Sequence, residues 1–309
     1  MIDVGIIIVN YNTKKLLLDC LRSVLANEGV SYHICVVDNC STDGSAEAVR
    51  EAFPEVEVIV TPRNGGYSYA NNIGLRRFGF HDEPGTPPAP DAPRYVLLLN
   101  PDTVLPPNAL ADMVAFMDAH PEAGAAGPKI LRPDGSLDRA CRRSFPTPEV
   151  SFWRMTGLSF LFPKSKRFGR YNLTYISPDE TIEVDSVVGA FMMVRREAVR
   201  DVGLLDEQFF MYGEDLDWAY RIKQAGWRIW YNANVTILHY KGAASRQRSV
   251  RSILAFYDAM HRFHRKHYWH QTITPLNWLI EAGIWVFCGI ELVRNAFRPR
   301  ERKGVASAV

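Results

Sequence analysis

Four short apolar runs, each followed at once by polar residues, constrain the fold of this chain more than any other feature. Such uninterrupted, β-branched runs are typical of strands buried on both faces of a parallel sheet. Segments with helical spacing of apolar residues lie between them, as from Leu16 to Leu25. This alternation predicts an α/β fold with a central, mostly parallel sheet flanked by helices. The expected strands are Val4–Val9, Tyr32–Asp38, Val56–Val60 and Tyr95–Leu99.

The polar residues after these runs fall at the carboxyl ends of the expected strands. They form the clusters Asn10–Asn12, Asp38–Asp43 and Asn100–Asp102. In open α/β sheets, ligands bind in the crevice outside the carboxyl ends of the strands. The three clusters are therefore expected to line one crevice.

Composition and charge exclude several classes of protein. The 309 residues are 47% hydrophobic and 23% charged, which is typical of a folded globular chain. A formal net charge of +2 argues against a protein that coats nucleic acid. The five cysteines have no CxxC spacing, which favours neither a disulfide framework nor a zinc cluster and indicates a reducing compartment.

Two carboxylates directly after strands are candidates for chemistry. Asp38 is placed to accept a hydrogen bond from a nucleotide base or a ribose hydroxyl, although a turn or helix-cap role is equally common there. Asp102, in Asn100-Pro101-Asp102, is placed to hold a divalent cation that neutralises a diphosphate. A simple Pro-Asp turn is the alternative.

Acids also crowd the first turn of a helix expected over Glu214–Gln224. Because acids favour the positive end of a helix, a purely structural role is open. Glu214 and Asp215 nevertheless project differently, so that one of them can face a crevice and deprotonate a hydroxyl nucleophile. His239 follows an expected strand, where a structural histidine is more common than a ligand.

The order of these motifs gives the chain a family resemblance. It resembles family 2 glycosyltransferases of the GT-A fold, and in particular the bacterial rhamnosyltransferase-type members. The resemblance covers about residues 3–270. It rests on Val9–Asn12, Val37–Gly44, Asn64–Tyr67, Ala70–Gly74, Asn100–Asp102, Gly189–Phe191, Gly213–Asp215 and His239.

The resemblance implies a binding site for a nucleotide sugar. Asn10, Tyr11 and Asp38 are expected to hold the base and ribose, and the loop Asn64–Gly66 and Asn71 to pack around them. Asn39 and Asn100 belong to the same set, whereas Gly189 and Ala190 border the donor sugar and the acceptor. Arg246, with Lys241 or Arg248, is expected to add positive charge to the diphosphate.

The resemblance also implies an inverting, metal-dependent transfer. Asp102 matches the metal ligand of the DxD motif, with Asn100 in place of the first acid, and His239 matches a metal-contacting histidine. The metal is expected to be Mg²⁺ or Mn²⁺. Asp215 matches the catalytic base, Glu214 is the alternate candidate, and Arg221 is expected to anchor their helix.

The implied substrates are a donor linked to dTDP, UDP or GDP and a glycan or polyprenyl-diphosphate-linked acceptor. The donor sugar is expected to be L-rhamnose, used in cell-envelope polysaccharide synthesis. Two alternatives remain: a sugar-nucleotide-binding protein without transfer activity, and a nucleotidyltransferase. The second should carry a glycine-rich, basic phosphate loop after the first strand, and Asn10-Tyr11-Asn12-Thr13 is not such a loop.

The end of the chain is basic and apolar. A basic, aromatic helix is expected over Ser249–Tyr268 and an apolar helix over Pro275–Phe297, followed by five basic residues between Arg294 and Lys303. Trp278 and Trp285 suit a membrane interface, so that a helix lying on an anionic surface is favoured over a true span. The alternative is a helix docked on the protein or on a second subunit.

The expected domain organisation follows these regions. Residues 1–245 form the catalytic domain, with a nucleotide-binding half up to about residue 105 and an acceptor half over 106–245. Residues 246–309 form a helical extension. The expected location is cytoplasmic, on the inner face of the plasma membrane, with no nucleic-acid partner, and the oligomeric state is not predicted.

Overall fold

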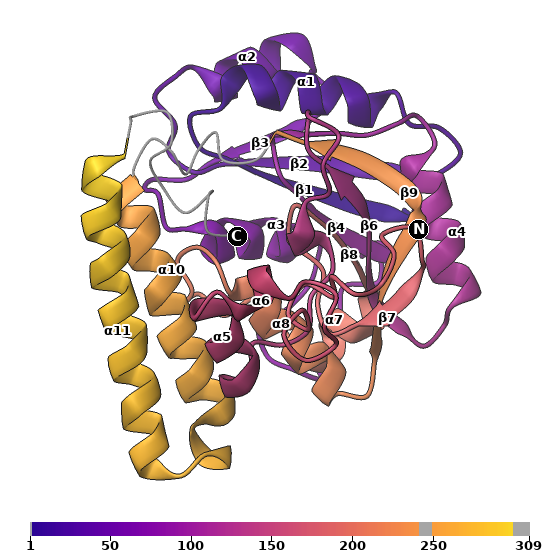
Figure 1. Cartoon of the computed structure of the whole chain (residues 1–309). Coiled ribbons are helices and arrows are strands. Elements are labelled where there is room, and N and C mark those ends of the chain that lie inside the picture. Colours follow the sequence, from indigo (N-terminus) through magenta and orange to yellow (C-terminus); the bar gives the residue numbers. More distant parts are fainter. Residues whose placement is uncertain (1, 241–248, 299–309) are drawn as a thin grey trace.

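The alternating strands and helices of the sequence assemble into one large sheet in a computed structural model, which describes residues 2–240 and 249–298 (Figure 1). Three buried apolar runs form central strands, because residues that leave water on both faces must be apolar throughout. The first strands are β1 (Val4–Asn10), β2 (Tyr32–Asp38), β3 (Glu57–Val60), β4 (Tyr95–Leu99) and β5 (Thr103–Val104). The later strands are β6 (Ala123–Leu131), β7 (Ile182–Val184), β8 (Phe191–Arg195) and β9 (Arg228–His239).

The sheet has a parallel half and a mixed half. Its strand order is β3-β2-β1-β4-β8-β6-β9-β5, and β7 also pairs with β9. The pairs among β1, β2, β3 and β4 are all parallel, as expected. Beyond β4 the strand directions are mixed: β8 is antiparallel to both β4 and β6, whereas β9 is parallel to β6 and antiparallel to β5 and β7. The expected parallel arrangement therefore describes the first half of the sheet and not the second.

Helices cover the sheet on both sides (Figure 1). In that view α1 and α2 lie above the strands and α3 lies below them. The helices of the first half are α1 (Lys14–Leu25), α2 (Ser45–Ala52), α3 (Tyr67–Arg77) and α4 (Ala109–Ala119). Those of the second half are α5 (Pro148–Met155), α6 (Leu158–Leu161), α7 (Arg196–Val202) and α8 (Glu214–Gln224), with a short 3₁₀ turn at Arg139–Cys141. One continuous hydrophobic core joins strands from β1 to β9 with the helices around them.

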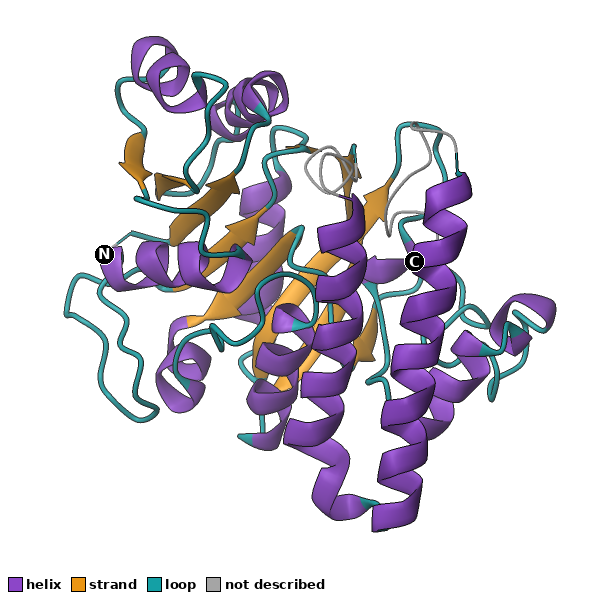
Figure 2. Cartoon of the chain, turned by 90° about the vertical axis from the view of Figure 1, so that its left-hand side faces the viewer, coloured by secondary structure: helices purple, strands orange, loops and turns teal. Residues whose placement is uncertain are grey.

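The chain ends in a long helical hairpin that stands beside the sheet (Figures 1 and 2). The first arm is α10 (Ser249–Phe263), continued by a π-helical turn over His264–Tyr268 and a 3₁₀ turn over Trp269–Gln271. The second arm is α11 (Thr274–Phe297). Both views show the two arms side by side along their length. Arg246, Lys241 and Arg248 lie outside the described residues.

Candidate functional site

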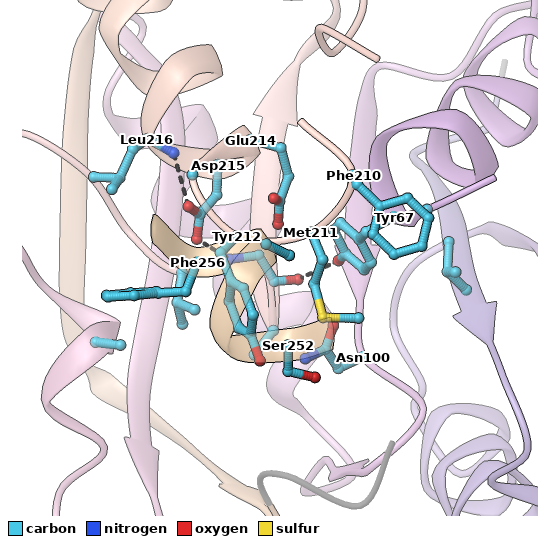
Figure 3. A pocket seen from close by; sticks show the side chains of 18 of the residues that line it. Tyr67, Asn100, Phe210, Met211, Tyr212, Glu214, Asp215, Leu216, Ser252 and Phe256 are labelled. Atoms are coloured by element: carbon cyan, nitrogen blue, oxygen red, sulfur yellow. Dashed lines mark hydrogen bonds between the residues drawn. The ribbon is translucent and has the colours of Figure 1, made fainter. Parts of the chain in front are cut away.

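A cavity of about 290 Å³ opens at the carboxyl ends of β1 and β4, where the polar clusters were expected to meet (Figure 3). Its walls come from both halves of the sheet, from the loop before α8, and from α10. Candidate residues that line it are Tyr11, Asn39, Gly66, Asn100, Asp102, Gly189, Ala190, Glu214, Asp215 and His239. Residues with no expected role that also line it include Arg143, Arg154, Tyr171, Phe210, Arg251 and Phe256. The cavity thus collects residues that are more than 200 positions apart in the sequence.

Asp102 and His239 meet at one end of the cavity because β5 pairs with the last residues of β9. Thr103 lies opposite His239 in the antiparallel register. This brings His239 Nε2 to 3.1 Å from Asp102 Oδ1, while His239 Nδ1 is 3.2 Å from Asp138 Oδ2. Burial lowers the pKa of His239, but the two carboxylates outweigh it and raise this pKa to about 9.

This end of the cavity has a donor set that fits Mg²⁺ or Mn²⁺. A carboxylate oxygen and an imidazole nitrogen only 3.1 Å apart can occupy adjacent positions around one ion. Asp138 holds the far ring nitrogen, which is the usual arrangement behind a metal-binding histidine. In residues 2–240 and 249–298 no three His, Cys, Asp or Glu side chains are grouped so as to hold a metal ion, so that a bound cation would need further ligands from outside these side chains.

The residues expected around a nucleotide divide into those that line the cavity and those behind its wall. Tyr11 and Asn39 line it. The buried Asp38 lies behind, where it accepts hydrogen bonds from Asn10 Nδ2 and the Ser41 N–H, both at 2.8 Å. Asn71 is also buried and donates to the Tyr67 carbonyl. Asp38 therefore closes the turn after β2, and its contact with a base or ribose stays a prediction.

Asn39 holds the loop of Asn64–Gly66 against the cavity. Its Nδ2 donates to the Gly66 carbonyl at 3.0 Å, and its Oδ1 accepts from the Gly65 N–H at 3.1 Å. Gly66 has φ of 97°, and a Cβ there would lie 2.4 Å from the Phe210 carbonyl oxygen. Only glycine fits this close approach between the loop and the segment before α8.

The first turn of α8 carries the acid pair at the other end of the cavity. Tyr212 and Gly213 both have positive φ, which turns the chain sharply into the helix. Asp215 Oδ2 accepts from Arg143 Nη2 at 2.7 Å and from the Gly189 N–H at 3.0 Å. Its Oδ1 accepts from the Leu216 N–H at 2.7 Å, as Figure 3 shows. Three donors therefore fix the Asp215 carboxylate in one orientation.

Glu214 points toward the middle of the cavity in Figure 3, and its environment differs from that of Asp215. Its Oε2 is buried and has no hydrogen-bond partner among the residues that the structure describes. Burial, reinforced by the charge of Asp215, raises the pKa of Glu214 to about 8. At neutral pH Glu214 is therefore a buried acid whose proton can be donated to a bound ligand.

Helix α3 holds the backbone on either side of the acid pair, at Gly189 and in the loop before α8. The Tyr67 N–H donates to the Phe210 carbonyl at 2.7 Å, and the Tyr67 hydroxyl donates to the Gly189 carbonyl at 2.9 Å. The Ser68 hydroxyl donates to the Phe209 carbonyl at 2.7 Å. The loop before α8 is thus held directly by a helix of the parallel half. Arg221 anchors α8 as expected, through Asp217 and two backbone carbonyls.

Arg143 and Asp138 belong to the site, and the sequence analysis missed both. Arg143 is buried, and its charge is balanced by Asp215. Burial lowers the pKa of this guanidinium, but the attraction of Asp215 outweighs it and the net shift is upward. Backbone hydrogen bonds with Ser186 in both directions fix Arg143 at the base of an irregular segment. Neither residue stands in a recognisable motif, so no local signal pointed to them.

A parallel βαβ half, a mixed second half and a cavity with an acidic residue at the end of β4 define a glycosyltransferase of the GT-A fold. The chain belongs to glycosyl transferase family 2, whose family profile matches residues 5–203. The protein is therefore a glycosyltransferase enzyme, and the resemblance seen in the sequence is confirmed.

Curated relatives in this family are similar over most of the chain. The N-acetylglucosaminyl-diphospho-decaprenol L-rhamnosyltransferase of Mycobacterium tuberculosis is 28% identical over 87% of this chain and 86% of its own length. The rhamnosyltransferase WbbL of Escherichia coli is 28% identical over 65% of this chain and 67% of its own. The hexosyltransferase Agl10 of Haloferax volcanii, named for low-salt glycan biosynthesis, is 26% identical over 84% of this chain and 74% of its own.

Solved structures share the fold at lower identity. TarS of Staphylococcus aureus aligns with a TM-score of 0.54 and 16% identity over 85% of this chain. GalNAc-T7, crystallised with UDP, GalNAc and Mn²⁺, aligns with a TM-score of 0.54 and 17% identity over 77% of this chain. This chain spans 39% and 43% of those two chains, respectively.

Proposed function

We propose that this enzyme transfers L-rhamnose from dTDP-rhamnose to a hydroxyl group of a lipid-linked saccharide in cell-envelope polysaccharide synthesis, with inversion at the anomeric carbon. The observation that carries the proposal is the cavity itself. One end of the cavity holds the metal-compatible pair Asp102 and His239, and the other end holds the acid pair Glu214 and Asp215. The names of two relatives, both rhamnosyltransferases, support the sugar.

The residues divide the work of a single displacement. The acceptor oxygen attacks the anomeric carbon, the bond from that carbon to the diphosphate breaks, and the acceptor proton passes to the Asp215 carboxylate. Three donors, Arg143, the Gly189 N–H and the Leu216 N–H, leave one lone pair of Asp215 available for that proton. Glu214, protonated at neutral pH, donates a hydrogen bond to a substrate oxygen in the cavity.

Asp102 and His239 are the residues that would hold a divalent cation, together with oxygens of the donor diphosphate. When bound, the ion supplies Lewis-acid stabilisation of the departing diphosphate. Asp138 keeps His239 oriented for this role by accepting from Nδ1. Asn39, Tyr11 and the Asn64–Gly66 loop form the wall against which the nucleotide binds.

Calorimetric titration with dTDP, UDP and GDP, each with and without Mn²⁺, tests the donor. We expect metal-dependent binding with dTDP preferred. A chromatographic assay then measures transfer from dTDP-rhamnose to a lipid-linked N-acetylglucosamine. Binding of dTDP without any transfer would favour the sugar-nucleotide-binding alternative, and no binding by the folded protein contradicts the donor assignment.

We also propose that the enzyme binds a membrane, because α11 buries polar side chains and exposes apolar ones. Among the described residues, α11 is the one helix that is long and apolar enough to span a bilayer, with a mean hydropathy of 1.5 over an 18-residue stretch. Only 22% of that stretch is buried. The buried positions include Asn277, Glu291 and Asn295. The outward face carries Leu279, Val286 and Val293, which are 68%, 61% and 61% exposed.

This arrangement fits a lipid bilayer as the occupant of the outward face. The polar positions of α11 are satisfied within the hairpin, as where His264 Nε2 lies 2.9 Å from Asn277 Oδ1. Trp278 and Trp285 are exposed on α11, and five basic residues follow between Arg294 and Lys303. Aromatic residues and clustered positive charge are typical of helices that lie on anionic membranes. We therefore propose that the enzyme lies on the inner face of the plasma membrane. In this proposal, residues 246–309 form a membrane-associating extension of the catalytic domain.

Vesicle sedimentation tests the membrane contact. The full chain should sediment with phosphatidylglycerol vesicles, and the triple variant L279E/V286E/V293E should bind at least about tenfold more weakly, since each buried apolar side chain contributes about 1.5–3 kcal/mol. The matched control is V60E, because Val60 is an exposed valine on the edge strand β3. Equal sedimentation of the triple variant contradicts the proposal. If wild type does not bind vesicles but forms a dimer that the triple variant abolishes, the outward face of α11 binds a second copy of the chain.

A further inference from the structure

Large apolar side chains are exposed around the short helix α6, which lies between the terminal hairpin and the mixed half of the sheet in Figure 1. Leu161 is 71% exposed, and the side chains of Phe152, Phe160 and Phe162 are all more than half exposed. We call these four residues the α6 patch. Apolar side chains gathered at the surface of a folded protein mark a contact with another molecule or with a membrane.

The α6 patch has a defined structure, because aromatic rings pack on one another beneath it. The Trp153 ring centre lies 5.0 Å from the ring centres of both Phe152 and Phe168. The Phe168 ring in turn lies 5.6 Å from that of Phe162. The Phe162 N–H donates to the Leu158 carbonyl at 3.0 Å. The exposure of the patch therefore belongs to the folded state.

Positive charge follows the patch directly in the sequence. The basic residues after α6 are all exposed: Lys164, Lys166, Arg167 and Arg170. Residues 150–178 contain no acidic side chain. Arg167 pairs with Glu149, whereas the other three cations form no ion pair with any residue that the structure describes. An unbalanced positive surface therefore borders the apolar one.

An anionic bilayer matches both features of this surface. Aromatic and aliphatic side chains flanked by Lys and Arg are typical of segments that lie in the interface of an anionic membrane. The apolar side chains enter the boundary between headgroups and acyl chains, and the cations meet lipid phosphates. A protein partner fits less well, because lysine is depleted at protein–protein interfaces.

The α6 patch adjoins the end of the cavity that holds the acid pair. Tyr171 lines the cavity and also a small hollow that Phe160 lines. The Tyr171 carbonyl accepts from the Ser144 N–H at 2.8 Å. Ser144 follows Arg143, which pairs with Asp215. A bilayer on the patch therefore lies at the side of the cavity where the acceptor is expected to be deprotonated.

We propose that the α6 patch inserts into an anionic bilayer, with Lys164, Lys166 and Arg170 in contact with lipid phosphates. This contact is separate from that of α11. It turns the acid-pair end of the cavity toward the bilayer, so that a lipid-linked acceptor reaches Asp215 without leaving the membrane. The inference rests on the proposed function for the acceptor, whereas the contact itself is measured without any transfer.

Sedimentation of the full chain with phosphatidylcholine vesicles, with and without phosphatidylglycerol, tests the contact. K164Q/K166Q/R170Q should bind the anionic vesicles about 10- to 100-fold more weakly, because each basic residue near an anionic surface strengthens binding about fivefold. Its binding to neutral vesicles should equal that of wild type. L161E should weaken binding to both kinds of vesicle about tenfold, since it removes an inserted apolar side chain. The loss in K164Q/K166Q/R170Q should persist in the L279E/V286E/V293E background, because the patch binds independently of α11.

The matched controls remove the same chemistry elsewhere. K14Q/K15Q/R50Q removes three exposed charges from α1 and α2, which lie at the top of Figure 1 and away from α6. V60E is the control for L161E. Both controls should sediment like wild type. Equal sedimentation of wild type and K164Q/K166Q/R170Q overturns the inference, and so does an equal loss in K14Q/K15Q/R50Q. A wild-type dimer that L161E abolishes, in a chain that binds no vesicles, overturns it in favour of a second copy.

A transfer assay separates this inference from the proposed function. K164Q/K166Q/R170Q should raise KM for a decaprenyl-linked acceptor in anionic vesicles at least about tenfold. KM for a water-soluble butyl analogue of the same acceptor should stay unchanged. An equal rise for both acceptors overturns the inference, because it shows an effect on the cavity itself. If wild type sediments as expected but transfers to neither acceptor, the proposed function fails and the membrane contact stands.

Discussion

Two groups of residues face each other across the cavity and are held by different forces. The strand-end group consists of Tyr11, Asn39, Asn100, Asp102 and His239, and strand ends or the turns after them supply its members. The acid–arginine group consists of Arg143, Glu214 and Asp215, and buried ion pairing and helix geometry position it. Backbone hydrogen bonds of the sheet therefore fix the first group, whereas charge fixes the second.

Because the two groups are held differently, the loss of a side chain should have different effects in each. Loss of a side chain from the strand-end group leaves the strands in place, so that its effects should be confined to ligand binding. Loss of one charge from the acid–arginine group leaves the other charge buried and uncompensated, which costs about 3–5 kcal/mol. The following variants test whether the two groups separate in this way.

The largest effect is expected for D215N. Removal of the base should lower kcat by about 10²–10⁴-fold, the usual contribution of a positioned proton acceptor. Binding of dTDP, measured by calorimetry, should stay the same because the strand-end group is untouched. D179N is the matched control, since Asp179 is 72% exposed and pairs with Lys129 on the surface. Weaker dTDP binding in D215N would show that the two groups are coupled.

The next effect is on stability and concerns the pair Arg143–Asp215, whose atoms are 2.7 Å apart in a buried setting. R143M should lower the free energy of unfolding in urea by about 3–5 kcal/mol. The double variant R143M/D215N should lose less than the sum of the two single variants, because each one removes the same interaction. Additive losses would mean that the pair contributes little.

Glu214 gives a pH dependence of known sign. Its pKa rises from an ordinary 4.5 to about 8 in the folded protein, through burial and then Asp215, with Arg143 opposing the shift. The folded state thus binds more protons than the unfolded state between pH 5 and 8, so the stability of wild type falls as pH rises through this window. The free energy of unfolding of wild type should decline by up to a few kcal/mol across this window, at about 1.4 kcal/mol per pKa unit, and E214Q should not show this decline. Urea unfolding at several pH values measures it, and parallel curves for the two proteins would refute it.

The smallest effect is expected for D138N, behind the strand-end group. The amide no longer accepts strongly from His239 Nδ1, and such changes usually weaken metal affinity about 10- to 100-fold. Titration of the dTDP complex with Mn²⁺ measures the change, and the free energy of unfolding should move much less than in R143M. Unaltered Mn²⁺ affinity would remove Asp138 from the site.

The sequence allowed the strand-end group and the acid pair to be predicted, and it left Arg143 of the acid–arginine group unseen. Asn100 and Asp102 follow a buried apolar run, and the rule that ligands bind at carboxyl ends places them in the crevice. The family resemblance supplied His239 and the acid pair. Nothing local distinguishes Arg143 from other arginines, because its role comes from Asp215, 72 positions later. The sequence predicted the helix α11, but it did not indicate that the polar side chains of this helix face the interior of the protein.

The bridge between Arg143 and Ser186 closes a loop of 42 intervening residues. Backbone hydrogen bonds at this bridge hold the two ends of the loop together, and β7, the last strand within the loop, pairs with β9 of the sheet. Lengthening such an excursion costs only about 0.6 kcal/mol for each doubling. The part of this loop before β7 is therefore expected to tolerate changes in length that leave the strands in place. We expect exchange of this part to alter the acceptor that the enzyme uses and to leave binding of the donor nucleotide unchanged.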